Sequence, residues 1–340
     1  MLPETFRCYL VDKDGAGRVA GRVAEAPTAG LPPGEVVLRV DYSSLNYKDA
    51  LAVTGHPGVN KVFPHIPGVD AAGKVVESGV DEFCPGDDVL ATGFDMGSNR
   101  WGGYGDFVRV PRDWVVPMPP GLSIRESMIL GTAGLTAGFC VEALLQHDLA
   151  PEKGPVVVTG ASGGVGGFAV AILARLGFEV VAVTGKQQAR DYLKSLGASQ
   201  VVGREAVSDD SGRALLSGRW AGAVDTVGSA PLATVLRATR RGGCVATCGN
   251  AAGVEIPGLT VFPFILRGIT LAGVDAAWCP IPLRHQTWEK LAGPWRLDDL
   301  ERFAQFIALE QLPEKVEDIL AGRITGRVVV AVSPRAEAES

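Results

Sequence analysis

The stretch VVVTGASGGVGG, Val156–Gly167, decides the fold of the second half of the chain. An apolar run ends at Thr159, a glycine-rich turn follows, and a helix is predicted to begin near Val165. Such a turn lets a diphosphate approach bare backbone and sit on the helix N-terminus, where unpaired N–H groups and the dipole favour anions. The alternative is a tight turn without a ligand, but the order of strand, turn and helix favours a dinucleotide site.

The glycine motif within this turn departs from the usual G-x-G-x-x-G pattern at one position. It reads Ala161-Ser-Gly163-Gly-Val-Gly166, so alanine replaces the first glycine. The residues expected to contact the diphosphate are Ser162, Gly163, Gly164, Val165 and Gly166.

The next predicted strand decides which dinucleotide the turn binds. Its apolar run ends at Thr184, about 20 residues after the glycines, where an NAD site places an acid to hold the ribose. An NADP site lacks that acid and carries cations for the 2′-phosphate. Here Thr184 is followed by Gly185 and Lys186, and Arg204 follows the third strand. These cations could be ordinary solvated loop charges, but together with the missing acid they favour NADPH.

The segments around this turn alternate between strand-like and helix-like patterns. From about Ser123 a helical apolar spacing begins, and strands and helices then follow one another through GAVDTVG, GGCVATCGN and GITLAGVDA. The strands are nearly continuous apolar runs, as a parallel sheet covered on both faces requires. We therefore predict a doubly wound α/β domain.

The first 125 or so residues have a different pattern of apolar and turn-forming residues. Short β runs such as EVVLRVDYSSL and GYGDFVRVP are separated by Gly and Pro turns, which is typical of an all-β barrel or sandwich. A PPG turn at Pro119–Gly121 marks a plausible domain boundary. The tail from Leu300 predicts one or two helices and a final β run, RITGRVVVAV, which we expect to return to the first domain.

Composition excludes several classes of protein. The formal net charge of −6 argues against a nucleic-acid binder, which needs a basic footprint. No apolar run reaches the ~18 residues of a membrane span, and the N-terminus lacks the apolar region of a secretory signal, so we expect a cytoplasmic protein. The six cysteines form no C-x-x-C pair and the four histidines show no H-x-x-x-H spacing, so no metal site is predicted.

Several long motifs carry a family resemblance. SLNYKDAL, IPGVDAAGKV, GASGGVGG, YLKSLGAS and FPFILRGITLAGVD resemble, in order and spacing, the medium-chain dehydrogenase/reductases, and most closely the acrylyl-CoA reductase branch. The resemblance implies a GroES-like β-barrel catalytic domain over residues 1–126 and a Rossmann-type NADPH-binding domain over residues 127–304. It also implies that residues 305–340 return to the catalytic domain.

The same resemblance implies where the reaction takes place. In zinc-dependent members, the loop matching Ser43–Ala52 and a later Gly-His-Glu supply metal ligands, whereas this chain has Ser44–Asn46 and then Val69 and Asp70. It therefore resembles the zincless members, and the resemblance makes Tyr47 the candidate proton donor, with the cofactor ribose or the substrate oxygen as alternative partners. It also implies that Asn46 orients the nicotinamide or its ribose. Asp49 and Asp70 are expected to bond nearby backbone amides. Other cofactor or subunit contacts implied are Gly249, Asn250, Phe264 and Asp275.

Three functions remain open at this stage. The first is NADPH-dependent reduction of the C=C bond of acrylyl-CoA or another 2-enoyl-CoA; the second is reduction of quinones or other activated alkenes; the third is dinucleotide binding without turnover. Arg100, Arg267 and Arg327 are candidates for contact with the CoA phosphates. GITLAGVDA resembles an edge strand that pairs with its twin, which implies a homodimer unless the helix near IPLRHQTWEKL covers the edge.

Overall fold

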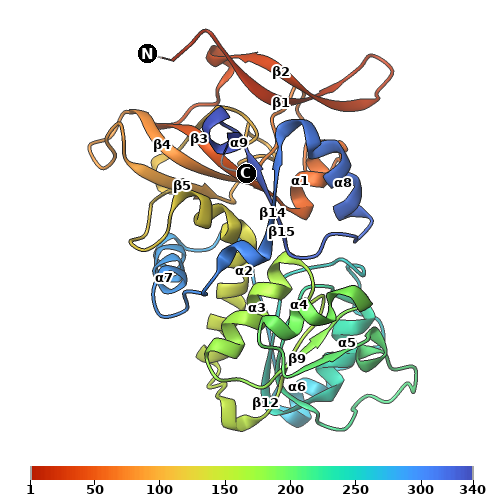
Figure 1. Ribbon diagram of the computed structural model, residues 1–340. Coiled ribbons are helices and arrows are strands. Elements are labelled where there is room, and N and C mark those ends of the chain that lie inside the picture. Colours follow the sequence, from red (N-terminus) through yellow and green to blue (C-terminus); the bar gives the residue numbers. More distant parts are fainter. Residues whose placement is uncertain (1, 339–340) are drawn as a thin grey trace. The chain divides into compact units, whose positions relative to one another are not determined.

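The computed structural model describes residues 2–338, without the side chains of Arg335 and Glu337 (Figure 1). Its contacts form two units. The first contains the residues up to Thr132, Ala277–Gly293 and the segment from Asp299 onward, and the second contains Ala133–Ala276 and Pro294–Asp298. The predicted boundaries at 126 and 304 therefore differ from these units mainly at Ala277–Gly293. That segment joins the first unit because the buried Arg284 guanidinium donates 2.7 and 2.8 Å hydrogen bonds to the carbonyl and hydroxyl of Thr92.

The first unit is built mainly from antiparallel strands, as the β runs of the sequence predict (Figure 1). A two-stranded sheet pairs β1 with β2, and a seven-stranded sheet has the order β14-β15-β3-β4-β5-β7, with β6 also pairing β3. Alternating apolar residues of these strands form one buried core. The strands are β1 (Thr5–Lys13), β2 (Val19–Pro27), β3 (Val36–Leu45), β4 (Asp70–Ser78), β5 (Asp88–Thr92), β6 (Phe107–Val110), β7 (Val115–Pro117), β14 (Ala304–Ala308) and β15 (Arg327–Ala331).

The C-terminal segment returns to the first unit, as predicted. β15 pairs antiparallel with β3, with Val329 opposite Ser44, and parallel with β14. The helix expected over the start of this segment is wrong in part, because Ala304–Ala308 forms β14 beside β15. The helices of the first unit are α1 (Tyr47–Val53), α7 (Ile281–Ala292), α8 (Leu312–Leu320) and α9 (Pro334–Ala338).

The second unit contains the predicted doubly wound sheet. Six parallel strands have the order β10-β9-β8-β11-β12-β13, which is 3-2-1-4-5-6 when they are counted along the chain, the Rossmann order. The strands are β8 (Val156–Val158), β9 (Val180–Val183), β10 (Gln200–Val202), β11 (Trp220–Asp225), β12 (Thr239–Thr247) and β13 (Thr270–Gly273). The helices are α3 (Gly164–Arg175), α4 (Arg190–Ser195), α5 (Ser229–Ala238) and α6 (Phe262–Arg267).

The segment that precedes the edge strand β13 exposes large apolar side chains. β13 is the last strand of the parallel sheet, as the sequence predicts. Near it in the chain, α6 and the residue before it expose four large apolar side chains, Val261, Phe262, Ile265 and Leu266. An apolar surface of this kind is typical of a contact with another molecule, and the homodimer stays a prediction.

A long apolar helix runs from the first unit into the second in sequence. α2 (Ile124–Gln146) is long and apolar enough, by length and composition alone, to cross a membrane, which differs from the expectation drawn from the sequence. In the most apolar window of α2, 78% is buried inside the protein, as in the core helix of a folded domain. Its helical geometry is interrupted at Gly131, where φ is 49° and ψ is −156°.

Candidate active site

The N-terminus of α1 presents the candidate catalytic tyrosine. Asn46 is the N-cap of this helix, and its backbone N–H donates a 2.9 Å hydrogen bond to Asp49 Oδ2, which satisfies one of the free N–H groups of the helix start. Tyr47 is the first helical residue, and 45% of it is exposed. The cap therefore holds a solvent-facing phenol on a fixed helix end.

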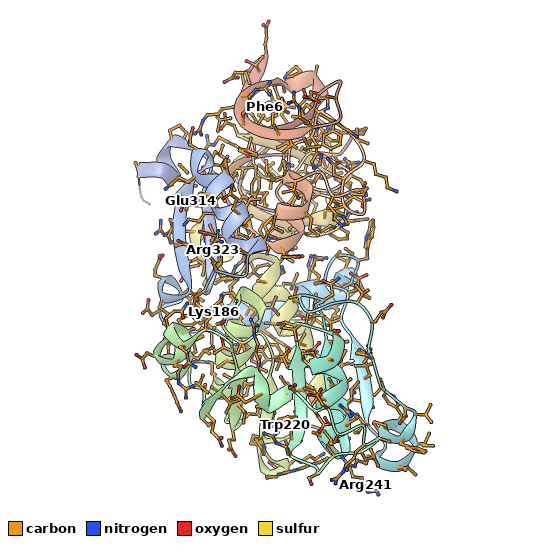
Figure 2. The ribbon with its side chains drawn as sticks, turned by 90° about the vertical axis from the view of Figure 1, so that its right-hand side faces the viewer. Phe6, Lys186, Trp220, Arg241, Glu314 and Arg323 are labelled. Carbon is orange, nitrogen blue, oxygen red and sulfur yellow. The ribbon has the colours of Figure 1, made fainter. Side chains whose placement is uncertain are left out.

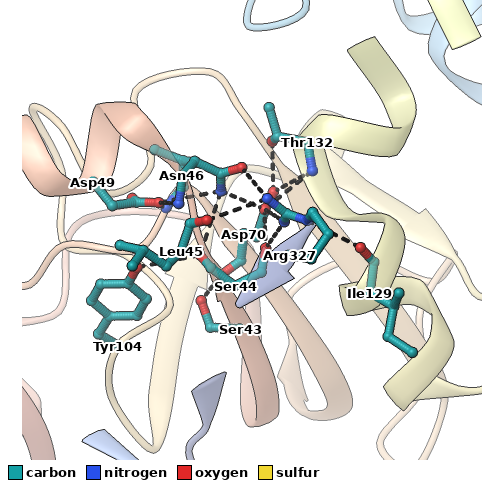
Figure 3. Close-up of polar contacts among 11 residues, drawn as sticks. Ser43, Ser44, Leu45, Asn46, Asp49, Asp70, Tyr104, Ile129, Thr132 and Arg327 are labelled. Carbon is teal, nitrogen blue, oxygen red and sulfur yellow. Dashed lines mark hydrogen bonds and ion pairs between the residues drawn. The ribbon is translucent and has the colours of Figure 1, made fainter. Parts of the chain in front are cut away.

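Beneath α1 lies a buried ion pair between β4 and β15 (Figure 3). Arg327 Nη2 is 3.7 Å from Asp70 Oδ2, and the two side chains are 4% and 0% exposed. The Arg327 guanidinium donates further hydrogen bonds to the carbonyls of Ile129 and Leu45, at 3.1 and 3.2 Å, and to Ser44 Oγ, at 2.6 Å. Paired and fully hydrogen-bonded charges of this kind fix local geometry, since any displacement leaves a charge buried without its partners.

The carboxamide of Asn46 ties α1 to this ion pair. Its Nδ2 donates to Asp70 Oδ2 at 2.8 Å and to Asp49 Oδ2 at 3.2 Å, and its Oδ1 accepts from Arg327 Nη1 at 3.0 Å. Asn46 thus links both carboxylates and the cation to the start of α1 (Figure 3). Tyr47 is the next residue along this helix. The structure places the Asn46 side chain in the support of α1, and its direct contact with a nicotinamide stays a prediction.

A glycine break in α2 lets the backbone reach the same carboxylate. At Gly131 a Cβ would lie 2.6 Å from Asp70 Oδ2 and 2.7 Å from Ser44 Oγ, and the positive φ is unfavourable for other residues. The break aims the next residue at Asp70: the Thr132 N–H donates to Oδ1 at 3.0 Å and its hydroxyl at 2.6 Å. Only glycine allows this close approach.

The second carboxylate, Asp49, is fully buried beside the first. Its Oδ1 accepts a 2.8 Å hydrogen bond from the Val69 N–H, as expected for a carboxylate that binds backbone amides. Burial, and next the negative charge of Asp70, raise the pKa of Asp49 to about 7. The pKa of the buried Tyr104, whose hydroxyl donates to the Ser44 carbonyl, is raised well above its usual range, first by burial and then by both carboxylates.

The glycine-rich turn of the second unit has the geometry that a diphosphate needs. It joins β8 to α3, whose first turn holds Gly164, Val165 and Gly166, and the N–H groups of a first helical turn have no partner within the helix. A Cβ added at Gly163 would meet only the Gly160 carbonyl oxygen, at 3.4 Å. A ligand can therefore approach the backbone closely at Gly163, and the residues present fit a diphosphate.

The end of β9 brings the residues predicted to choose the dinucleotide together. Thr184 is buried, and its hydroxyl shares a 2.9 Å hydrogen bond with Ser162 and accepts a 3.1 Å one from the Lys186 N–H. Arg204 lies over Gly185, where a Cβ would be 2.5 Å from its Nε. Burial, and next the charge of Arg204, lower the pKa of Lys186. Two cations placed side by side beside buried hydroxyls suit a phosphate dianion.

The end of β12 forms an open hollow in the same unit. Gly249, Asn250 and Asp275 line it together with Thr247, Cys248, Gly273 and Val274. Phe264, predicted alongside them, is not among the lining residues, because it lies on α6 and packs partly buried against the core of the second unit. Within residues 2–338 no group of three or more His, Cys, Asp or Glu side chains could hold a metal ion.

Two family models match separate parts of the chain. The model described as alcohol dehydrogenase GroES-like domain matches residues 32–120, and the one described as zinc-binding dehydrogenase matches residues 164–291. The acrylyl-CoA reductase AcuI of Ruegeria pomeroyi is 46% identical over 329 residues, which cover 96% of this chain and 99% of that protein. The chain belongs to the medium-chain dehydrogenase/reductase family.

Solved structures support this place in the medium-chain dehydrogenase/reductases. Escherichia coli YhdH with bound NADPH is 45% identical, with a TM-score of 0.92 over 96% of this chain and 100% of that one. YhfP of Bacillus subtilis, named as a quinone oxidoreductase, is 46% identical over 96% of this chain and 98% of that protein. Its structure with NAD bound has a TM-score of 0.93. The predicted GroES-like and Rossmann-type folds are thereby confirmed, and the chain is an oxidoreductase of this family.

All three arginines considered for the CoA phosphates contact other parts of the chain in this medium-chain dehydrogenase/reductase. Of the three only Arg327 is buried, and a contact of Arg100 or Arg267 with CoA stays a prediction. Arg327 is buried in the ion pair with Asp70. Arg267 donates to the carbonyls of Arg237, Thr239 and Leu216, and Arg100 donates to the Pro33 carbonyl and lies over the Trp114 ring. The sequence does not indicate that Arg327 is buried in a polar network. The only signal is its position at the start of the apolar strand GRVVVAV.

Proposed function

We propose that this protein reduces the C=C bond of acrylyl-CoA, or of a similarly short 2-enoyl-CoA, with NADPH. The observation that carries the proposal is an exposed phenol, Tyr47, held at the end of α1 by a buried network of charges and hydrogen bonds. The 46% identity to an acrylyl-CoA reductase over 99% of that protein supports the same substrate class.

The chemistry required of the chain is charge stabilisation and proton delivery. NADPH, when bound, supplies a hydride for the β-carbon of the alkene. Negative charge then develops on the thioester oxygen, and a hydrogen-bond donor fixed in advance lowers the free energy of that transition state. The Tyr47 hydroxyl is the donor that we assign to this oxygen, and either it or a water molecule then gives the α-carbon its proton.

The buried network explains why Tyr47 can act as a fixed donor. A donor lowers the barrier only if it is already oriented when the charge develops. Asn46 holds the start of α1, and Asp70 with Arg327 holds Asn46, so the helix end has little freedom to turn away. We therefore assign Asn46 a positioning role in this reaction.

The cofactor is NADPH, and we assign its 2′-phosphate to the cation pair Lys186 and Arg204. Figure 2 shows Lys186 toward one end of the second unit. Arg241, at the start of β12, lies toward the other end and therefore serves as the control below. Replacing both Lys186 and Arg204 with alanine is expected to raise the KM for NADPH about 100-fold, because each charge-assisted contact with a phosphate contributes roughly 1.5–3 kcal/mol before the discount for exposure. The KM for NADH should change little.

Steady-state kinetics with the two nucleotides checks this assignment. The Arg241→Ala variant, which removes an exposed arginine from the same unit, is the matched control and should keep the preference of the natural protein. Equal losses with NADPH and NADH in the double variant would show that the two cations do not read the phosphate.

The substrate itself is tested with acryloyl-CoA and 1,4-benzoquinone, each with NADPH. We expect kcat/KM for acryloyl-CoA to exceed that for the quinone by roughly 10²-fold, because only the thioester uses the oriented donor and the remote contacts of a CoA substrate. A higher kcat/KM for the quinone would instead favour the second candidate function, which the name of YhfP supports. Turnover of neither compound would exclude both.

A further inference from the structure

Phe94, in the loop after β5, has an unusual backbone conformation. Its φ is 54°, in the left-handed region that a bulky side chain rarely adopts. In this conformation its N–H donates a 3.0 Å hydrogen bond to the Ala277 carbonyl, and its own carbonyl accepts a 3.4 Å one from Lys48 Nζ. Strained residues of this kind persist where the surroundings hold them, and they cluster at functional sites.

The ring of Phe94 is held from three directions. It stacks on Trp114 with 4.8 Å between centroids and 3° between planes, and the Arg284 guanidinium lies 4.4 Å from its centroid. Trp278 meets it edge-on at 5.6 Å. Stacking and cation–π contacts, each contributing about 1 kcal/mol, offset the backbone strain. Phe94 thereby contacts both Lys48, through its carbonyl, and Trp278, through its ring.

Lys48 and Trp278, the two residues that Phe94 contacts, are both partly exposed to solvent. Trp278 is 58% exposed, and Tyr47 and Trp278 are the two exposed large aromatic residues of the first unit within residues 2–338. Lys48 follows Tyr47 directly, so the cation and the indole lie on the part of the unit that carries the proposed catalytic phenol. An exposed indole offers a ligand a large apolar face and one N–H donor.

The polar capacity of Lys48 is also largely unused. An ammonium group has three N–H donors. In the part of the chain that the structure describes, the Lys48 ammonium has one long hydrogen bond, to the Phe94 carbonyl, and no ion pair with a carboxylate. A donor beside an apolar aromatic surface matches a ligand that carries carbonyl acceptors on a chain of methylene and methyl groups.

We propose that Lys48 and Trp278 bind the pantetheine arm of the acyl-CoA substrate. The inference rests on the proposed function and extends it from the reacting thioester to the chain next to it. The arm has two amide carbonyls, which accept hydrogen bonds from Lys48, and methylene and gem-dimethyl groups, which cover the Trp278 indole. These contacts make the two residues determinants of specificity for CoA thioesters over small activated alkenes.

Three thioesters with the same reactive group test the proposal: acryloyl-CoA, acryloyl-pantetheine and S-ethyl thioacrylate, which lacks the arm. Trp278→Ala and Lys48→Met should each lower kcat/KM about tenfold for the first two substrates, mainly through KM, because about 60 Å² of apolar contact or one charge-assisted hydrogen bond is lost. Both should leave kcat/KM for S-ethyl thioacrylate unchanged. Trp278→Phe and Lys48→Arg, which keep the aromatic face and the charge, should retain most activity, and melting temperatures compare the folds.

The outcomes separate this proposal from its competitors. Equal losses with all three thioesters would assign the residues to the fold or to the chemical step, and no loss with any of them would exclude contact with substrate. A loss with acryloyl-CoA but not with acryloyl-pantetheine would place the contact on the nucleotide and overturn the assignment to the arm. If the natural protein does not reduce acryloyl-CoA, the proposed function fails; titration calorimetry with propanoyl-CoA then decides the inference, which predicts tighter binding by the natural protein than by Trp278→Ala.

Discussion

Replacing Arg327 with methionine is expected to lower the free energy of unfolding by about 3–5 kcal/mol, which is typical when one partner of a buried ion pair is removed. The guanidinium is 4% exposed and lies 3.7 Å from a carboxylate that is 0% exposed. Methionine fills much of the same volume, so the loss comes mainly from an Asp70 carboxylate left in the interior without its cation. Unfolding by urea, followed through the tryptophan fluorescence, measures the change.

Two further variants separate charge from packing in this result. The double variant Asp70→Asn with Arg327→Met removes both charges, so it should recover part of the stability lost in the single variant. Arg323→Met removes another arginine of the first unit, one that pairs with Asp318 at 2.8 Å but is 59% exposed, and it should change stability far less. If Arg327→Met and Arg323→Met have equally small effects, the buried pair does not hold the site together.

The parts of the fold that local patterns determine were predictable from the sequence. VVVTGASGGVGG contains its strand, its turn and its helix start within twelve residues, and the structure has β8 and α3 where the pattern predicts them. β14 was missed because Ala304–Ala308 owes its extended form to pairing with β15, a neighbour that lies about 20 residues further along the chain. The segment Ala277–Gly293 belongs to the first unit because the buried Arg284 bonds to Thr92. The sequence of the segment alone does not reveal this contact.

The candidate site divides in the same way. Asn46, Tyr47 and Asp49 lie within four residues, which the sequence indicates as a polar loop at the active site, whereas in the structure Asn46 caps the helix α1. Their connection to Arg327 depends on the register of β15 against β3, which places Val328 opposite Leu45. The site also depends on Gly131, where α2 is interrupted and Thr132 is brought to Asp70. The only sign of this interruption in the sequence is one glycine within an apolar helix. Long-range register and backbone breaks are set by tertiary packing, and local sequence patterns do not contain them.

The largest effect on activity is expected at the phenol. Tyr47→Phe removes one hydroxyl and keeps the ring, so α1 and the network beneath it should be preserved, and the melting temperature should change little. With acryloyl-CoA and NADPH, kcat should fall roughly 10²-fold or more, which is the usual scale for losing one oxyanion donor or one general acid. Tyr9→Phe, which removes the hydroxyl of a buried tyrosine on β1 of the same unit, is the control and should retain kcat.

The division of the effect between kcat and KM decides what Tyr47 does. A fall in kcat and in kcat/KM by the same factor means that the hydroxyl interacts only with the transition state, as a donor to the developing enolate requires. A rise in KM with kcat intact means that it binds the ground state and the transition state equally, which would reduce Tyr47 to a binding residue. If neither constant changes, water protonates the α-carbon and another group holds the thioester oxygen. The network of Asn46, Asp70 and Arg327 would then support α1 as a scaffold, and the proposed role of Tyr47 would be wrong.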